Sequence, residues 1–306
     1  MNDRPIGLIQ RAAERLRNQK PEIGIVPPTT AADEILPNAA QGAATALQER
    51  VVEPPPADDA ETLRISREVK IDRQRLAKSG IIITNTERSR VAEEFRIIVR
   101  QILAKAQQAS NENAAGPGRI IMITSSRPRE GKTFTSINIA LAIASQRDYR
   151  VLAMDCDVER QSMTSVLGIE VEKGLVDLIA DESIDLRDIL LRTDIPNLTV
   201  LPAGRKRPGV PELLSSRRMR EILTEMAHRY ADRYIVIDAP PCLATSDPSI
   251  LASLVGQIVF VVEANRTQGP EIEESLRLVS SCPNISLVLN KMEGTTSDHF
   301  GSYGYY

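Results

Sequence analysis

Tryptophan is absent from the sequence, and cysteine and histidine are scarce. The 306 residues include three cysteines, with no Cys-x-x-Cys pair, and two histidines that lie far apart. Neither a disulfide framework nor a histidine-based metal cluster is therefore predicted, and we expect the thiols to be reduced. No apolar run approaches the ~18 residues of a membrane-spanning helix, and no secretory signal opens the chain. We therefore expect a cytoplasmic protein. The net charge of −3 gives no indication of nucleic-acid binding, and none is expected.

Aromatic residues are few and unevenly distributed. None occurs before Phe95, whereas three of the six tyrosines lie in the last four positions, namely Tyr303, Tyr305 and Tyr306. The first third of the chain therefore lacks the residues for a core of its own. Because glycine and serine separate the terminal tyrosines from the rest of the chain, we expect residues 292–306 to form a flexible tail.

Residues 1–64 are predicted to be extensions and not a domain. Apolar residues at helical spacing lie among basic ones in the first 20 positions: Ile6, Ile9, Ala13 and Leu16. We expect a short amphipathic helix over 1–20, either on the surface or docked on a partner or an anionic membrane. Residues 21–64 are rich in proline and alanine and have no periodic apolar face, which predicts a disordered linker.

A lead-in of helices is expected over 65–115, before the first strand. A helix after Ser89 would bury one apolar face, made of Val91, Phe95, Ile98 and Ile102. Three charged residues form a stripe elsewhere on this helix: Glu93, Arg96 and Arg100. The stripe is either a solvated salt-bridge face or a contact between subunits.

A strand, a polar loop and a helix follow one another from Ile120, and together they predict a phosphate-binding cradle. Loop N–H groups and the positive end of the helix would converge on an anion. Lys132 would reach the β- and γ-phosphates of ATP, and the Thr133 hydroxyl would ligate Mg²⁺. Ser126 stands where such a loop has its first glycine. The predicted nucleotide-binding residues are Ser126, Arg127, Pro128, Arg129, Glu130, Gly131, Lys132, Thr133 and Phe134.

Acidic residues end two further buried strands. Asp155 and Asp157 end the strand that begins at Arg150, and Asp238 ends the strand that begins at Tyr234. The spacing suits right-handed crossovers between parallel strands, whose carboxyl ends share one edge of a sheet. We expect Asp157 and Asp238, with Thr133, to hold Mg²⁺ directly or through water.

Additional strands are expected over 198–201, 257–263 and 285–289. The last is followed by Asn290, which is placed to read an adenine edge. The predicted fold is therefore an α/β P-loop NTPase over residues 65–291, with a mostly parallel sheet and helices on both faces.

Three motifs resemble those of one family. Ile123–Thr133, Met154–Arg160 and Ile237–Pro241 are similar to the Walker A, A′ and B motifs of the bacterial tyrosine kinases, P-loop autokinases that accompany exopolysaccharide export. Leu8–Leu16 and the Glu-Glu-Phe-Arg-Ile-Ile run that begins at Glu93 resemble the exosortase-associated branch. That resemblance implies recruitment to the inner face of the membrane by a chain-length-determinant-type activator, and a homo-oligomer, possibly a ring.

The sequence departs from the family motifs at three positions. Arg129 replaces the glycine of Pro-Gly-Glu-Gly-Lys, and Glu159 stands where an arginine is common. Val99 takes the last arginine position of a Glu-x-x-Arg-x-x-Arg oligomerisation motif, with Arg100 adjacent.

The activity that the resemblance implies is transfer of phosphate from ATP to the tail tyrosines of a neighbouring copy, which regulates exopolysaccharide synthesis or export. Lys132, Asp155 and Asp157 would be catalytic, with Asp155 accepting or orienting the tyrosine proton. Which of the two aspartates is the base and which the metal ligand stays open.

Other protein classes with this fold are alternatives. The main one is a switch ATPase of the partitioning or septum-site kind, which carries a signature lysine where Arg127 stands here. An iron–sulfur carrier is disfavoured because the sequence has no Cys-x-x-Cys pair. A non-catalytic subunit is disfavoured because neither the loop lysine nor any of the acids is lost.

Overall fold

The computed structural model describes residues 67–82, 89–112, 117–229 and 233–292. The expected helix over 1–20, the linker over 21–64 and the tail tyrosines Tyr303, Tyr305 and Tyr306 lie outside the described residues. Among the described helices, none has both the length and the apolar character that crossing a bilayer would require.

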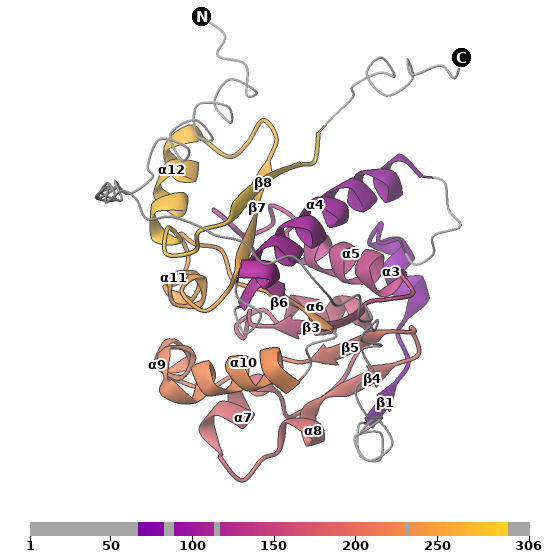
Figure 1. The fold of residues 1–306 in the computed structure, drawn as a ribbon, viewed down its shortest axis with the longest axis vertical. Coiled ribbons are helices and arrows are strands. Elements are labelled where there is room, and N and C mark those ends of the chain that lie inside the picture. The colour runs from indigo at the N-terminus through magenta and orange to yellow at the C-terminus, as the bar shows by residue number, and fades with distance from the viewer. Residues whose placement is uncertain (1–66, 83–88, 113–116, 230–232, 293–306) are drawn as a thin grey trace, which may run out of the picture.

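One eight-stranded sheet organises the molecule, with the strand order β1-β4-β5-β3-β6-β2-β7-β8 (Figure 1). The strands are β1 (Arg67–Val69), β2 (Ile120–Ser125), β3 (Arg150–Asp155), β4 (Leu191–Thr193), β5 (Leu198–Leu201), β6 (Arg233–Asp238), β7 (Gln257–Glu263) and β8 (Ile285–Asn290). Neighbouring strands pair in parallel except β4 and β5, which are antiparallel. The predicted mostly parallel sheet is confirmed.

Helices cover both faces of this sheet. They are α3 (Arg73–Lys78), α4 (Arg90–Glu112), α5 (Lys132–Ala144), α6 (Ser162–Leu167), α7 (Leu175–Ala180), α8 (Leu186–Ile189), α9 (Val210–Ser215), α10 (Arg217–Arg229), α11 (Asp247–Ala252) and α12 (Gly269–Leu278), with a 3₁₀ turn, η1, at Pro117–Arg119. Figure 1 shows α3, α4 and α5 grouped on one side of the sheet, and α7, α9 and α10 on the other.

Strand alternation divides the apolar residues into two cores. Along β2, Ile120 and Met122 contribute to the core under α7 to α12, whereas Ile121 and Ile123 contribute to the core under α3 to α6. Because successive side chains of a strand point to opposite faces, a fully buried strand must be apolar throughout. The continuous apolar runs of the sequence follow from this two-sided burial.

Helix α4 buries a slightly different face from the predicted one. Phe95 and Ile102 are buried as expected, but Val91 is 39% exposed, and the core-facing stripe includes Val99. Val99 is completely buried, so the position that the family motif gives to arginine faces the core in this chain. The adjacent Arg100 lies on the exposed face.

The charged stripe of α4 is held together by ion pairs. Glu93 pairs with Arg96 at 2.6 Å and with Arg100 at 3.5 Å. Glu93 and Arg100 are exposed and Arg96 is partly exposed, so these pairs contribute little to stability.

Two short strands were not predicted. β1 pairs with β4, and the carboxylate of Asp194 just after β4 accepts a hydrogen bond from the Ile71 N–H at 2.9 Å. Each strand has only three residues, too few to show an alternating pattern. They attach the lead-in segment to the edge of the sheet.

Candidate active site

The loop between β2 and α5 is held in shape from inside by one buried acid. The Glu130 carboxylate accepts hydrogen bonds from the Arg127 N–H at 2.8 Å and from the Thr267 hydroxyl at 2.5 Å. Gly131 precedes α5 with φ of 100°, a conformation that glycine adopts without strain. The side chain of Glu130 therefore shapes the loop, and its predicted contribution to nucleotide binding is indirect.

The ends of β7 and β8 hold the same loop from outside. The Asn290 amide donates to the Glu130 carbonyl at 2.9 Å, and Lys291 Nζ donates to the Arg129 carbonyl at 2.6 Å. Lys291 is itself paired with Glu263 at 3.2 Å. We call Asn290, Lys291 and Glu263 the loop clamp. Asn290 thus lies beside the phosphate loop, and its predicted adenine contact stays a prediction.

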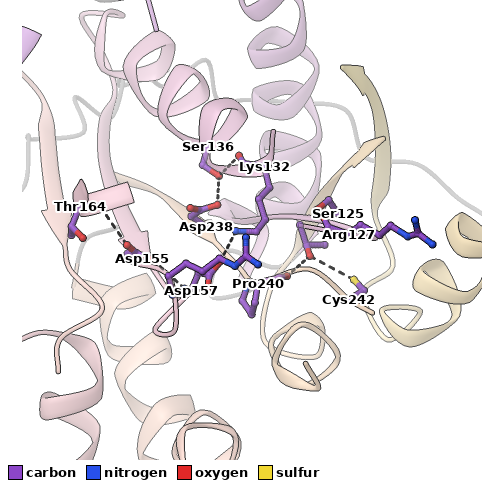
Figure 2. Close-up of polar contacts among 12 residues, drawn as sticks. Ser125, Arg127, Lys132, Ser136, Asp155, Asp157, Thr164, Asp238, Pro240 and Cys242 are labelled. Carbon is purple, nitrogen blue, oxygen red and sulfur yellow. Dashed lines mark hydrogen bonds and ion pairs between the residues drawn. The ribbon is translucent and has the colours of Figure 1, made fainter. Parts of the chain in front are cut away.

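Lys132 meets the predicted acids at the carboxyl edge of the sheet (Figure 2). Its Nζ lies 2.6 Å from Oδ2 of Asp157, and the two side chains are only 6% and 3% exposed. Asp155 and Asp238 are paired in register on the adjacent strands β3 and β6. The structure therefore brings together four residues from three segments that are far apart in the sequence.

Two backbone N–H groups orient Asp155. The N–H of Asp157 donates to Oδ1 of Asp155 at 3.1 Å, and the N–H of Thr164 donates to Oδ2 at 3.4 Å. Asp157 lies just after the end of β3 and not within the strand. The two carboxylates consequently have different partners. Asp157 forms an ion pair with Lys132, whereas Asp155 accepts hydrogen bonds from backbone N–H groups.

Burial dominates the protonation of these acids. Burial and then the charge of Asp238 raise the pKa of Asp155 to about 8. Burial also raises the pKa of Asp238, against the opposing effects of Lys132 and the Thr133 hydroxyl. Three neighbouring buried carboxylates share one lysine, so the site would carry uncompensated negative charge if all three were ionised.

This excess charge fits a divalent cation. Oδ2 of Asp238 is buried without a hydrogen-bond partner among the described residues, and so is Oδ1 of nearby Asp247. Across the described ranges, no three acidic, cysteine or histidine side chains converge closely enough to hold a metal ion by themselves. Water and nucleotide phosphates would have to complete the coordination, as is usual for Mg²⁺.

A cavity of about 220 Å³ opens in front of the loop. Its lining includes Gly131, Lys132 and Thr133 from the loop and α5, and Arg160 from the segment after β3. Phe134 also lines it and packs edge-to-face on Phe95, with ring centroids 5.8 Å apart. Of the predicted nucleotide-binding residues, this cavity is therefore lined by Arg129, Gly131, Lys132, Thr133 and Phe134, and not by the three acids.

Arg127 and Ser126 point elsewhere. The Arg127 side chain forms an ion pair with Glu271 of α12 and turns away from the acids in Figure 2. The Ser126 hydroxyl is bonded to the Ser275 hydroxyl at 3.0 Å. These side chains fasten the loop to α12, so their predicted nucleotide contacts can involve only the backbone in this conformation.

Some site residues were missed from the sequence. The Ser136 hydroxyl donates to Oδ1 of Asp238 at 3.0 Å. Ser136 lies one helical turn after Lys132 and therefore on the same face, a spacing that would have identified it. The clamp residues Lys291 and Glu263 had no such signal, because they contact the loop only through the folded sheet.

Known proteins resemble the chain in sequence and in structure. A family model described as an AAA domain matches residues 118–279. The tyrosine-protein kinase CpsD of Streptococcus agalactiae is 28% identical over 234 residues, which are 76% of this chain and 96% of that protein.

Two solved kinase domains are similar in fold. The VpsO kinase domain is 30% identical, with a TM-score of 0.53, over 67% of this chain and all of that chain. The kinase domain of Escherichia coli tyrosine kinase ETK is 25% identical, with a TM-score of 0.56, over 83% of this chain and all of that chain. The family match spans more than half of the sequence, and the chain therefore belongs to the AAA-domain family and, within it, to the bacterial tyrosine-protein kinases.

Proposed function

We propose that this kinase transfers the γ-phosphoryl group of ATP to Tyr303, Tyr305 and Tyr306 of a neighbouring copy. The observation that carries the proposal is the convergence of Lys132 with Asp155, Asp157 and Asp238 beside a phosphate loop. Phosphoryl transfer depends mainly on positioning and on neutralisation of charge, and this site offers both.

Each side chain has a distinct part in this chemistry. The loop N–H groups and Lys132 would hold the phosphates. When ATP binds, the Lys132 ammonium would therefore leave Asp157 and pair with a phosphate oxygen. Thr133, Asp157 and Asp238 would hold Mg²⁺, which when bound neutralises phosphate charge. Asp155, fixed by two N–H groups, accepts the proton of the incoming tyrosine hydroxyl.

A protonated Asp155 cannot act as a base. At neutral pH, the raised pKa keeps Asp155 largely protonated in the protein without ligands. Positive charge bound among the acids favours the ionised form and lowers this pKa. Asp155 would therefore act as a base only when the site holds its cation.

The tail starts close to the site. Lys291, the residue after β8, contacts the phosphate loop, and the acceptor tyrosines follow within the next 15 residues. The switch-ATPase alternative is weakened by Arg127, which stands where those proteins carry their signature lysine and is paired here with Glu271 of α12. We further propose the exosortase-associated branch, a membrane activator of the chain-length-determinant type, and a role in exopolysaccharide synthesis or export at the inner membrane face.

Incubation of the purified full chain with Mg·ATP, followed by phosphotyrosine mapping, tests this function. We expect phosphate on the tail tyrosines, and none in Lys132→Met. Because removal of Lys132 leaves Asp157 buried and unpaired, a cost of about 3–5 kcal/mol, its folding must be checked by circular dichroism. A triple change of the tail tyrosines to phenylalanine serves as a second, structurally mild control.

Mixing experiments separate transfer within one copy from transfer between copies. A kinase whose chain ends at Met292 is mixed with Lys132→Met, which keeps its tail. Phosphate on the inactive copy is the expected result. ATP hydrolysis without any phosphotyrosine would contradict the proposal and favour the switch ATPase.

A further inference from the structure

Arg129 occupies a backbone conformation that suits glycine. Its φ is 70°, in the left-handed region, where a Cβ atom comes too close to the following carbonyl oxygen. The family motif places glycine at this position, whereas this chain has arginine. Strained backbone positions are concentrated at functional sites, so a strained arginine in a phosphate loop suggests a function for its side chain.

The loop clamp explains how this strain is tolerated. Lys291 Nζ holds the Arg129 carbonyl at 2.6 Å, and Asn290 holds the next carbonyl, that of Glu130, at 2.9 Å. Because these bonds involve backbone atoms of the loop, they remain whichever side chain stands at position 129. Glycine at this position would therefore keep the loop shape and remove the strain.

The Arg129 side chain is exposed and lines the cavity in front of the loop together with Lys132, Thr133 and Arg160. Within the described part of the chain, its guanidinium makes no hydrogen bond or ion pair. Arg127, two residues earlier, is instead tied to Glu271. The loop therefore has one arginine that fastens it to α12 and a second that faces the cavity beside Lys132 and Thr133.

We propose that the guanidinium of Arg129 is a direct ligand of the nucleotide phosphates, in addition to Lys132 and the loop N–H groups. This assignment rests on the proposed binding of ATP. The planar fork of arginine donates two parallel hydrogen bonds to phosphate oxygens, which a lysine cannot reproduce. Arg129 thereby supplies, from a side chain, an anion contact that a glycine loop makes only through its backbone.

Substitution of Arg129 by glycine tests the proposal without damage to the loop. We expect Arg129→Gly to bind Mg·ATP about 10-fold or more weakly, as judged by titration with a fluorescent ATP analogue and by calorimetry. Its melting temperature should be equal or higher, because the strain is relieved. Arg129→Lys should recover only part of the affinity.

Arg147→Ala is the matched control, since Arg147 is an exposed arginine just beyond the opposite end of α5. It removes the same charge and should bind Mg·ATP as the unaltered protein does. Unchanged affinity in Arg129→Gly would overturn the inference while the proposed kinase function stands. Unchanged affinity with slower phosphotransfer would also overturn it and would place the guanidinium on the acceptor. Absence of ATP binding in the unaltered protein would overturn both proposals.

Discussion

At the level of single residues, the charges of Lys132 and Asp157 compensate each other in a buried ion pair. With a separation of 2.6 Å and almost no exposure, each charge depends on the other for compensation. Asp155 and Asp238 have no such partner, and burial raises the pKa of both. The protein without ligands therefore keeps a proton among its acids where the loaded protein would keep a cation.

Replacement of Asp155 by Asn should stabilise the metal-free protein at neutral and mildly alkaline pH. The folded-state pKa of Asp155 rises from the ordinary 3.8 to about 8, so the native state holds a proton that the unfolded state has lost. Stability of the unaltered protein therefore falls as pH increases between these two values. The asparagine side chain of Asp155→Asn does not titrate, so the stability of the variant does not fall for this reason.

Thermal unfolding in EDTA measures the effect. We expect the melting temperature of Asp155→Asn to exceed that of the unaltered protein by several degrees at about pH 8, and by much less at about pH 4. Phosphotransfer should be abolished in the same variant. A difference that does not change with pH would show that folding does not raise the pKa of Asp155.

At the level of elements, the phosphate loop depends on the strand ends beside it. β7 lies next to β2, and β8 lies next to β7. Asn290 at the end of β8 holds the Glu130 carbonyl, and the following Lys291 holds the Arg129 carbonyl. The amide of Asn290 also lies where a Cβ atom at Gly131 would stand, so close that only glycine fits there. The loop, its glycine and the end of β8 therefore form one packed unit.

Asn290→Ala should weaken the binding of Mg·ATP and Mg·GTP by the same factor, about 5- to 10-fold. The amide donates to a loop carbonyl, and its loss loosens the phosphate cradle for any nucleotide. Competition titrations against one fluorescent nucleotide give both constants. Loss confined to ATP would support instead the predicted contact with the adenine edge, and unchanged binding of both would exclude either role.

At the level of the whole molecule, phosphorylation should loosen the assembly of copies. Each phosphate adds about −1.5 to −2 charges, so three tail phosphates add a charge of roughly −5 to each copy, and neighbouring copies repel one another. The exposed charged stripe of Glu93, Arg96 and Arg100 on α4 offers a contact that such charge would disturb.

Sedimentation velocity before and after exhaustive autophosphorylation measures this change. We expect a smaller assembly after phosphorylation, with the effect reduced at high salt. A variant with phenylalanine at all three tail positions should keep its size in the presence of Mg·ATP. Equal sizes before and after phosphorylation would contradict the prediction.

The sequence alone determined most of the local structure and the identity of the reacting groups. Buried strands of four or more residues appear as continuous apolar runs, and the loop with Lys132 has a motif of fixed spacing. Asp155 and Asp238 were recognised because each ends such a run, and Asp157 because it lies two residues after Asp155. These features depend on residues that are neighbours in the chain, so a linear pattern records them.

Only the tertiary structure decided which side chains act on one another. β6 lies between β3 and β2, so Asp155 lies opposite Asp238, and the raised pKa of Asp155 follows from that burial. The clamp on the loop and the rotation of α4 that buries Val99 likewise depend on packing between distant segments. Electrostatic interaction and burial are set by distance in space, which the order of residues along the chain does not record.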